Sequence, residues 1–381
     1  MASSPLKILH VLRAPLGGLF RHVLDLAECQ TARGHQVGIV AASGGSPAAN
    51  ERLNALGKTL ALGVSRISMG RQLGLGDIAA IRHVRRHVAA LTPDVVHGHG
   101  AKGGAYARLA PANPAPTSAA IKVYTPHGGS LHYGRHTPQG MIYGAAERFM
   151  MTRTDLILFE SAFARDKFQD TIGVPGSVVR VVHNGIRADE MIPVEPTATA
   201  ADLVFVGELR MLKGPDVLID AMARLRRNGR PVTAAIAGDG PDRATLEQLV
   251  ATAGLTNSIR FLGHAPARQA FAEGHVLAVP SRAESLPYIV LEAAGAGLPI
   301  LTTRVGGIPE IFGSPDALLP PGDAQALADG ILAKLIDPAG AKAAAQALRA
   351  RVGREFSQDA MVEGVLAAYG EAIDRKFHRS H

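Results

Sequence analysis

Aromatic residues and cysteine are scarce in this chain. Of its 381 residues, 4% are aromatic, none is tryptophan and only one, Cys29, is a cysteine. The composition therefore does not indicate carbohydrate binding through stacked aromatic rings. A single cysteine cannot form an internal disulfide, which excludes a disulfide-stabilised scaffold and is typical of a reducing compartment.

Long apolar runs are absent as well. No uninterrupted apolar stretch approaches the roughly 20 residues that are needed to span a bilayer. The first residues lack a basic segment followed by a long apolar core, so they do not indicate a secretory signal. We therefore expect a cytoplasmic protein, either soluble or held peripherally at the inner face of the cell membrane.

The net charge of +7 and the pI of about 9.7 favour acidic partners such as nucleic acid, anionic lipid or phosphorylated substrates. The basic residues cluster on two predicted helices, at Arg82, Arg85, Arg86 and at Arg224, Arg226, Arg227, Arg230. A solvated helix face is the simpler interpretation, and contact with a membrane surface is the alternative. Nucleic acid is not expected as a partner, because interleaved aromatics, helix-turn-helix motifs and zinc motifs are lacking.

Apolar segments of strand length alternate with helical segments along most of the chain. They are rich in Val, Ile and Leu with little polar alternation, as expected for strands that are buried on both faces. The predicted strands are residues 6–13, 36–42, 94–99, 122–127, 156–159, 178–183, 203–206, 233–238, 259–262, 276–280, 300–302 and 317–319. The order of strand, helix and strand predicts an α/β fold with parallel sheets.

This alternation weakens between residues 186 and 201, where Pro193, Glu195 and Pro196 precede alternating Thr and Ala. We interpret residues 186–201 as a linker between two Rossmann-like domains, residues 1–185 and residues 202–355. We expect a ligand to bind in a cleft between them, outside the carboxyl ends of the strands.

Two carboxylates give the strongest chemical signal. Glu284 follows a predicted strand and Glu292 lies on the next helix, so both can face the same cleft. An ionised carboxylate accepts two hydrogen bonds at once, which suits the binding of sugar hydroxyls. Taken alone, the pair is more simply interpreted as two surface acids, so the flanking residues decide the interpretation.

Glycines and cations flank the two carboxylates. Gly306 and Gly307 follow the next strand, where the backbone can approach a phosphate closely, and Pro309 begins a helix whose N-terminus attracts anions. Arg210 and Lys213 follow another strand of this half and can neutralise a pyrophosphate leaving group. For Lys213 the alternative is an exposed loop lysine.

The first half of the chain carries weaker signals. Gly17 and Gly18 open the first helix, but the turn is not Gly-x-Gly-x-x-Gly and no acidic residue ends the second strand. A nicotinamide enzyme is therefore poorly supported. His127 ends a strand beside flexible backbone, where structural and functional roles are equally open on local grounds.

His97 and His99 lie on one face of a predicted strand and are spaced like a pair of metal ligands. No acidic or cysteine ligand accompanies them in the sequence, and the chain has no Asp-x-Asp motif. We therefore expect no metal site.

Taken together, these segments resemble the retaining glycosyltransferases of family four, which have the GT-B fold. The resemblance covers nearly the whole chain and is most specific over residues 284–310. The matching segments are Gly17-Gly18, Gly34-His35, His127-Gly128, Asn184-Gly185-Ile186, residues 207–214, 237–241, 261–263 and 284–310.

The resemblance implies two Rossmann-like domains that face each other across a cleft, with a final helix (residues 356–377) packing back on the first. It implies that Glu284 binds hydroxyls of the donor sugar and Glu292 the ribose of the nucleotide. Lys213 with Arg210 holds the diphosphate as it leaves, and His127 contacts the donor sugar near the reacting carbon. The glycines implied to contact the donor are Gly17, Gly18, Gly238, Gly263, Gly306 and Gly307.

The chain departs from the family pattern in two places. Family members often have an arginine directly after the glycine where this chain has Glu208, so Lys213 is the firmer phosphate ligand and Arg210 the weaker. The Gly or Ser, Phe, Gly run after the first glutamate is replaced by residues 285–288, Ser-Leu-Pro-Tyr. This replacement predicts an altered sugar pocket.

We therefore expect a retaining, hexosyltransferase-type enzyme that moves a sugar from a nucleotide diphosphate sugar to a glycan or lipid-linked acceptor. The resemblance implies no metal and no further cofactor, and it suggests a role in envelope or exopolysaccharide biosynthesis. Tyr133, Arg135 and His136 are interpreted as an acceptor-side loop from their position alone. Two alternatives stay open: a nucleotide-sugar epimerase of the same fold, and a non-catalytic sugar-nucleotide-binding subunit.

Overall fold

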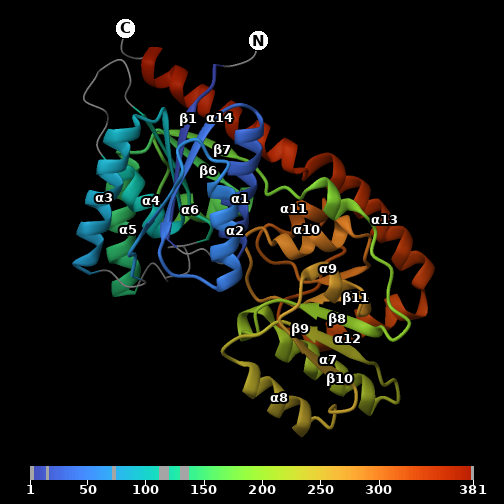
Figure 1. Ribbon diagram of the computed structural model, residues 1–381. Coiled ribbons are helices and arrows are strands. Elements are labelled where there is room, and N and C mark those ends of the chain that lie inside the picture. The colour runs from blue at the N-terminus through green and yellow to red at the C-terminus, as the bar shows by residue number, and fades with distance from the viewer. Residues whose placement is uncertain (1–3, 14–16, 71–73, 111–119, 129–136, 379–381) are drawn as a thin grey trace. The chain divides into compact units, whose positions relative to one another are not determined.

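The computed structural model describes residues 4–13, 17–70, 74–110, 120–128 and 137–378. The chain divides into two compact units, one of residues 1–183 with 359–381 and the other of residues 184–358. Each unit has a parallel sheet with helices around it, so the predicted α/β class is confirmed (Figure 1).

The first unit is built on a seven-stranded parallel sheet in the order β3-β2-β1-β4-β5-β6-β7. Its strands are β1 (Lys7–Leu12), β2 (Gln36–Ala42), β3 (Val64–Ile67), β4 (Val95–His99), β5 (Ile121–Thr125), β6 (Leu156–Phe159) and β7 (Val178–Val181). Its helices are α1 (Gly17–Ala32), α2 (Pro47–Gly57), α3 (Gly76–Leu91), α4 (Gly100–Leu109), α5 (Pro138–Met151), α6 (Ala162–Thr171) and nearly all of α14 (Gln358–His378).

Successive residues of β1 point into different parts of the core, which explains why residues 8–12 are apolar except for the buried His10. Ile8 packs in a cluster with residues of α1 and α14, including the fully buried Tyr369. Its neighbour Leu9 packs in a second cluster, with residues of α3 and α4. A strand that is covered on both faces has no solvent side, so it needs no polar alternation.

The second unit is built on a five-stranded parallel sheet in the order β10-β9-β8-β11-β12. Its strands are β8 (Ala201–Val206), β9 (Ala234–Ala237), β10 (Ile259–Gly263), β11 (Gly274–Val279) and β12 (Ile300–Thr302). Its helices are α7 (Pro215–Arg227), α8 (Arg243–Thr252), α9 (Ala267–Phe271), α10 (Tyr288–Gly295), α11 (Ile308–Phe312), α12 (Ala324–Ile336) and α13 (Pro338–Glu355), with 3-10 turns η2 (Ala188–Met191) and η3 (Met211–Lys213).

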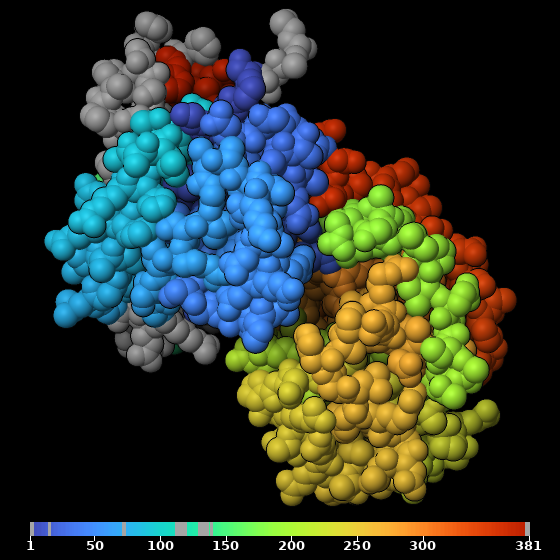
Figure 2. Space-filling view, in the orientation of Figure 1, coloured from blue at the N-terminus to red at the C-terminus, as the bar shows by residue number. Residues whose placement is uncertain are grey.

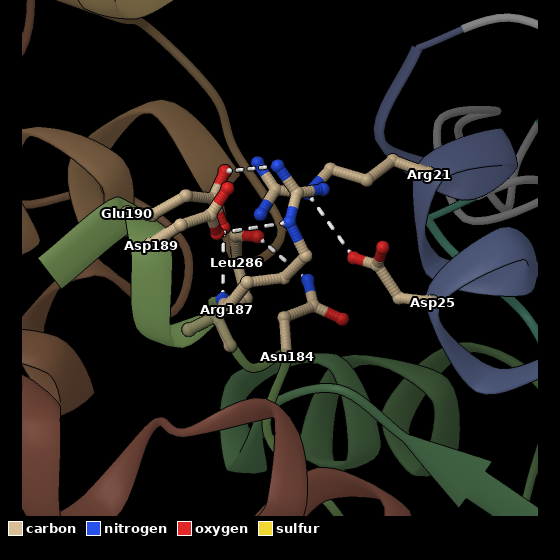
Figure 3. Close-up of polar contacts among 7 residues, drawn as sticks. All are labelled: Arg21, Asp25, Asn184, Arg187, Asp189, Glu190 and Leu286. Atoms are coloured by element: carbon tan, nitrogen blue, oxygen red, sulfur yellow. Dashed lines mark hydrogen bonds and ion pairs between the residues drawn. The ribbon is translucent and has the colours of Figure 1, made fainter. Parts of the chain in front are cut away.

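Residues 186–201, predicted as a linker, belong to the second unit in the structure and contain η2 and the start of β8. The side chain of Arg187 pairs there with Asp189, 3.1 Å away (Figure 3). Just before this segment, the buried Asn184 donates a hydrogen bond from Nδ2 to the carbonyl oxygen of Leu286 at 2.9 Å. Asn184 therefore fixes the start of the second unit to the segment that follows Glu284.

One strand prediction was wrong, and one strand was not predicted. Residues 64–67 form β3 at the edge of the first sheet, although this strand was not predicted. Three of its four residues are only partly buried, so Val-Ser-Arg-Ile lacks an apolar run. Residues 317–319 were predicted as a strand but contribute only a single bridge, between Leu319 and Thr303. Among the described residues, no helix is long and apolar enough to cross a membrane.

Candidate functional site

The sheet of the second unit has one point at which its strand order reverses. β8 pairs with β9 on one side and with β11 on the other. From β8 the chain continues to β9 and β10 in one direction, and from β11 it continues to β12 in the opposite direction. In an open parallel sheet, a crevice forms at this point, outside the carboxyl ends of the strands. Lys213 follows β8 and Glu284 follows β11, so the predicted cation and acid come from the two strands that flank it.

Lys213 and Glu284 form an ion pair. Nζ of Lys213 lies 2.8 Å from both carboxylate oxygens of Glu284. The exposed fraction of the lysine side chain is 31%, whereas that of the glutamate is 7%. The carboxylate is therefore the fixed member of the pair, and the ammonium group is the member that faces solvent.

Two residues that the sequence did not reveal hold this pair in place. Ser281 donates a hydrogen bond from Oγ to Oε1 of Glu284 at 2.7 Å. Arg282 pairs with Asp216 at the start of α7, with Nη1 2.7 Å from Oδ1, and its backbone N–H donates to the carbonyl of Leu212 at 2.8 Å. The loops after β8 and β11 are thereby joined on both sides of the ion pair.

Gly306 is required by packing against the loop that carries Glu284. Its φ is +59°, and an added Cβ would lie 2.1 Å from the carbonyl oxygen of Glu284. The neighbouring Gly307 donates its N–H to the carbonyl of Ser285 at 2.6 Å. Both predicted donor-binding glycines therefore lie next to Glu284, and they fix the position of its backbone.

Of the remaining predicted residues of this unit, two glycines lie at the carboxyl ends of strands. Gly238 follows β9 with φ +139°, and Gly263 ends β10 with φ +69°. Glu292 lies on α10 and is partly buried. Nη1 of Arg210 lies 3.8 Å from Oε2 of Glu208, and both side chains are about half exposed. This ion pair therefore contributes little to the stability of the fold.

The first unit gathers histidines at the corresponding point of its own sheet, where β1 and β4 meet. His10 lies on β1, directly opposite His97 on β4. His99 ends β4, and its ring centroid is 3.9 Å from that of His97. His22 of α1 meets the predicted site residue His127 edge to face, with centroids 4.9 Å apart.

Hydrogen bonds link these rings to one another. Nδ1 of His10 lies 3.0 Å from Nε2 of His99, and Nδ1 of His99 lies 3.2 Å from Nε2 of His127. His97 bonds instead to the hydroxyls of Tyr369 and Thr125, at 2.7 and 2.8 Å. His127 has a φ of +49°, a conformation that is uncommon for residues other than glycine.

Burial keeps these histidines neutral. It lowers the pKa of His10 to about 4 and that of His127 to about 3. The pKa values of His97 and His99 are also well below the usual range, first through burial and then because two protonated rings this close would repel each other. These four histidines are therefore uncharged at neutral pH. Each neutral ring has one nitrogen that donates a hydrogen bond and one that accepts.

The structure adds partners to the isolated pair His97 and His99. Two trios have ligand atoms within 4.8 Å of one another: His10, His97, His99 and His22, His99, His127. In the first trio, both ring nitrogens of His10 and both of His97 already bond to protein groups. The expectation of no metal site stays a prediction.

Other predicted residues of the first unit are only partly described. Gly17 is the first residue of α1, with φ +66°, and Gly18 follows it in the helix. Tyr133, Arg135 and His136, interpreted as an acceptor-side loop, lie outside the described residues.

Comparison with protein families identifies the class of this chain. The family model described as Glycosyltransferase Family 4 matches residues 16–190, and that described as Glycosyl transferases group 1 matches residues 200–337. The two matches fall on the two parallel-sheet units. The chain belongs to the family-four glycosyltransferases, and it is a glycosyltransferase with a GT-B fold.

Its relatives include enzymes of different specificity. The chain is 28% identical to the glycogen synthase of Mycobacterium tuberculosis, over 93% of this chain and 91% of that protein. It is 26% identical to the D-inositol 3-phosphate glycosyltransferase of Mycobacteroides abscessus, over 62% of this chain and 56% of that protein. Among solved structures, Anabaena HepE in complex with UDP has a TM-score of 0.79 at 20% identity, covering 96% of this chain and all of that one.

Proposed function

We propose that the second unit binds a nucleoside diphosphate sugar and that the enzyme transfers the sugar to a glycan or lipid-linked acceptor with retention of configuration. The observation that carries this proposal is the Lys213–Glu284 pair at the point where the strand order reverses. The solved structures of HepE with UDP and with UDP-glucose support a nucleoside diphosphate sugar as the donor.

The ion pair suggests how the donor is held. Glu284 is buried and anchored by Ser281, so it stays in place and accepts hydrogen bonds from sugar hydroxyls. The more exposed Lys213 turns from the carboxylate to the diphosphate and stabilises the negative charge that develops when the sugar leaves. Arg210 assists at the diphosphate, Glu292 binds the ribose, and the neutral His127 contacts the sugar.

The proposed chemistry needs no protein nucleophile. The bond between the anomeric carbon and the diphosphate oxygen breaks while the acceptor oxygen bonds to the same face of that carbon. The leaving phosphate takes up the proton of the acceptor hydroxyl. Lys213 and Arg210 supply the positive charge at the leaving group, so we propose that transfer proceeds without a divalent metal ion.

A nucleotide-release assay tests this proposal. Uridine, guanosine and adenosine diphosphate sugars are supplied with EDTA to wild type, Glu284→Ala, Lys213→Met and, as a control, Glu51→Ala on the exposed face of α2. We expect release from one donor, normal in Glu51→Ala and reduced about 100- to 1,000-fold in Lys213→Met, the usual effect of removing one group that stabilises transition-state charge.

The assay also separates the alternatives. Absence of donor binding for every nucleotide contradicts the proposal. Donor binding without release in the presence of lipid-linked and glycan acceptors favours a non-catalytic subunit. Conversion of the sugar to an epimer without an acceptor favours the epimerase.

We also propose that the first unit contacts a membrane that carries the acceptor. Helices α3 and α5 both pack against α4, and α3 lies in the cyan surface of Figure 2. The large apolar side chains exposed at α3 and on α5 are Leu75, Ile78, Met141, Ile142 and Phe149, with exposed fractions of 49% or more. The exposed arginines of α3 are Arg82, Arg85 and Arg86. Exposed apolar groups beside cations suit an anionic bilayer surface.

Vesicle flotation tests the membrane proposal. We expect binding to phosphatidylserine vesicles that weakens with salt, and weaker binding of a variant with Arg82, Arg85 and Arg86 replaced by Gln. The matched control replaces Arg226, Arg227 and Arg230 of the second unit, which are exposed as well. Equal binding by both variants would show that the surface of α3 and α5 is a solvated face.

A further inference from the structure

The buried histidines of the first unit form a hydrogen-bonded chain whose direction is fixed at one end. Oε1 of Gln30 lies 2.8 Å from Nε2 of His10, and both residues are fully buried. A carbonyl oxygen only accepts hydrogen bonds, so Nε2 of His10 carries the proton. Because His10 is neutral, its Nδ1 has no proton and acts as an acceptor.

The same logic runs along the chain to His127. Nδ1 of His10 accepts from Nε2 of His99 at 3.0 Å, so His99 is protonated on Nε2. His99 is neutral, so its Nδ1 accepts from Nε2 of His127 at 3.2 Å. His127 is neutral too, which leaves its Nδ1 without a proton.

The orientation of the Gln30 amide rests on its contact with His10. The amide oxygen is the atom that lies 2.8 Å from the ring nitrogen, and the buried amide nitrogen makes no hydrogen bond among the described residues.

The neighbouring ring stays outside this chain. One ring nitrogen of His97 is hydrogen-bonded to Tyr369 and the other to Thr125, so neither nitrogen is available for a hydrogen bond with His99. It packs against His99 with a centroid distance of 3.9 Å and restricts the tilt of that ring. The chain from Gln30 through His10 and His99 to His127 is therefore unbranched among the described residues.

We propose that Gln30, His10 and His99 are positioning residues that hold His127 in the tautomer with Nε2 protonated and Nδ1 bare. His127 then offers an acceptor, and no donor, to a ligand that approaches Nδ1. This inference rests on the proposed function, in which His127 contacts the donor sugar. The ligand group selected by Nδ1 is a hydroxyl, which donates to it, and a sugar without that hydroxyl loses the contact.

Tautomers are measured directly by NMR. The full chain is labelled with 15N-histidine and studied at pH 8 with EDTA, and His10, His99 and His127 are assigned by single substitutions. We expect all three to carry the proton on Nε2. A proton on Nδ1 of any of them would overturn the proposal. Zinc binding at Nε2 of His127, with loss of the Nε2 proton to the buffer when equimolar zinc replaces EDTA, would also overturn it.

Two substitutions at Gln30 connect the tautomer to activity. Gln30→Glu keeps an acceptor toward His10, whereas Gln30→Met removes it with little change in side-chain length. We expect His127 to keep its tautomer in the Glu variant and to become a mixture in the Met variant, with kcat/KM for nucleotide release about tenfold lower than in the Glu variant. This is the effect of one hydrogen bond.

A matched control removes an equally buried hydrogen bond outside the chain. Thr125→Val takes the partner from Nε2 of His97, and we expect the tautomers of His99 and His127 to remain as in wild type. A tautomer change in this variant equal to that in Gln30→Met would overturn the proposal, because the effect would then be general loosening. If nucleotide release is absent in every variant while the tautomers are as expected, the proposed function fails and the assignment of the tautomers stands.

Discussion

The neutral histidines of the first unit make its stability depend on pH in a defined direction. In the folded protein the pKa of His10 is about 4, compared with an ordinary value of 6.5. Between these two values the unfolded chain binds a proton that the folded chain does not, so the free energy of unfolding falls as the pH falls. The stability that His10 contributes is fully present above pH 6.5 and is lost toward pH 4.

The magnitude follows from the shift. Each pH unit in this window costs about 1.36 kcal/mol for one histidine, so acidification from pH 8 to pH 5 removes about 2 kcal/mol through His10 alone. His97 and His99 act in the same direction, because their pKa values are lowered too. His127 adds less than its pKa alone suggests, since its side chain is only partly buried.

Hydrogen exchange measured by mass spectrometry resolves the two units, which a single unfolding curve does not. After correction for the intrinsic exchange rate, we expect peptides of β1 and β4 to lose at least about 2 kcal/mol of protection between pH 8 and pH 5. Peptides of β8 and β11 serve as the internal reference, because the histidine cluster lies wholly in the first unit.

The variant His10→Gln isolates the effect. Its stability differs from wild type at every pH, so the quantity compared is the loss between pH 8 and pH 5 within each protein. We expect this loss to be about 2 kcal/mol smaller in the variant. An equal loss in both proteins, or no loss in wild type, would refute the assignment of a neutral, buried His10.

Three further predictions concern single contacts. Gly306→Ala forces a side chain at φ +59° against the Glu284 loop and should destabilise the second unit by about 1–3 kcal/mol in urea unfolding, whereas Gly44→Ala, with open space around its Cβ, should be nearly neutral. Glu147→Gln leaves the fully buried Arg108 without its counter-charge and should cost about 3–5 kcal/mol, a loss largely rescued by also replacing Arg108 with Met. Ser281→Ala removes a hydrogen bond to a charged group and should lower kcat/KM for nucleotide release by about 10- to 100-fold, with wild-type values as the contrary result.

Most of the fold could be predicted because buried parallel strands leave a clear trace. The strands β1 and β8 are mostly apolar and rich in Val, Ile and Leu, since each is covered on both faces. The edge strand β3 leaves no such trace, because only Ile67 of its four residues is buried. Residues 317–319 have the composition of a strand, but only one bridge, to Thr303, holds them.

The candidate site could be predicted in its residues but not in its contacts. Lys213 and Glu284 each follow a strand, which local sequence reveals, but their ion pair joins positions 71 residues apart. Arg282 was missed for the same reason, because its partner Asp216 is 66 residues away. A sequence shows which side chains end strands, and only the strand order shows which of those ends are neighbours.

The histidine chain shows this limit most clearly. The sequence indicates His97 and His99 as a pair and His127 separately, and no local pattern connects them to His10 or Gln30. Register brings them together, because β1 lies beside β4 and places His10 opposite His97. The order of donors and acceptors along the histidines depends on the side-chain amide of Gln30. Gln30 is one of several polar residues of α1, and the sequence does not indicate that it contacts a histidine.

The path of the chain through the two units sets the order in which they can be completed during synthesis. The first unit needs residues from α14, where Val362, Val365 and Tyr369 fill the core against β1. These residues leave the ribosome after the whole of the continuous second unit. The N-terminal unit therefore finishes folding second, reversing the usual N-to-C order of domain folding. A nascent chain of about 350 residues therefore exposes the apolar surface of the first unit that α14 covers once it has been synthesised.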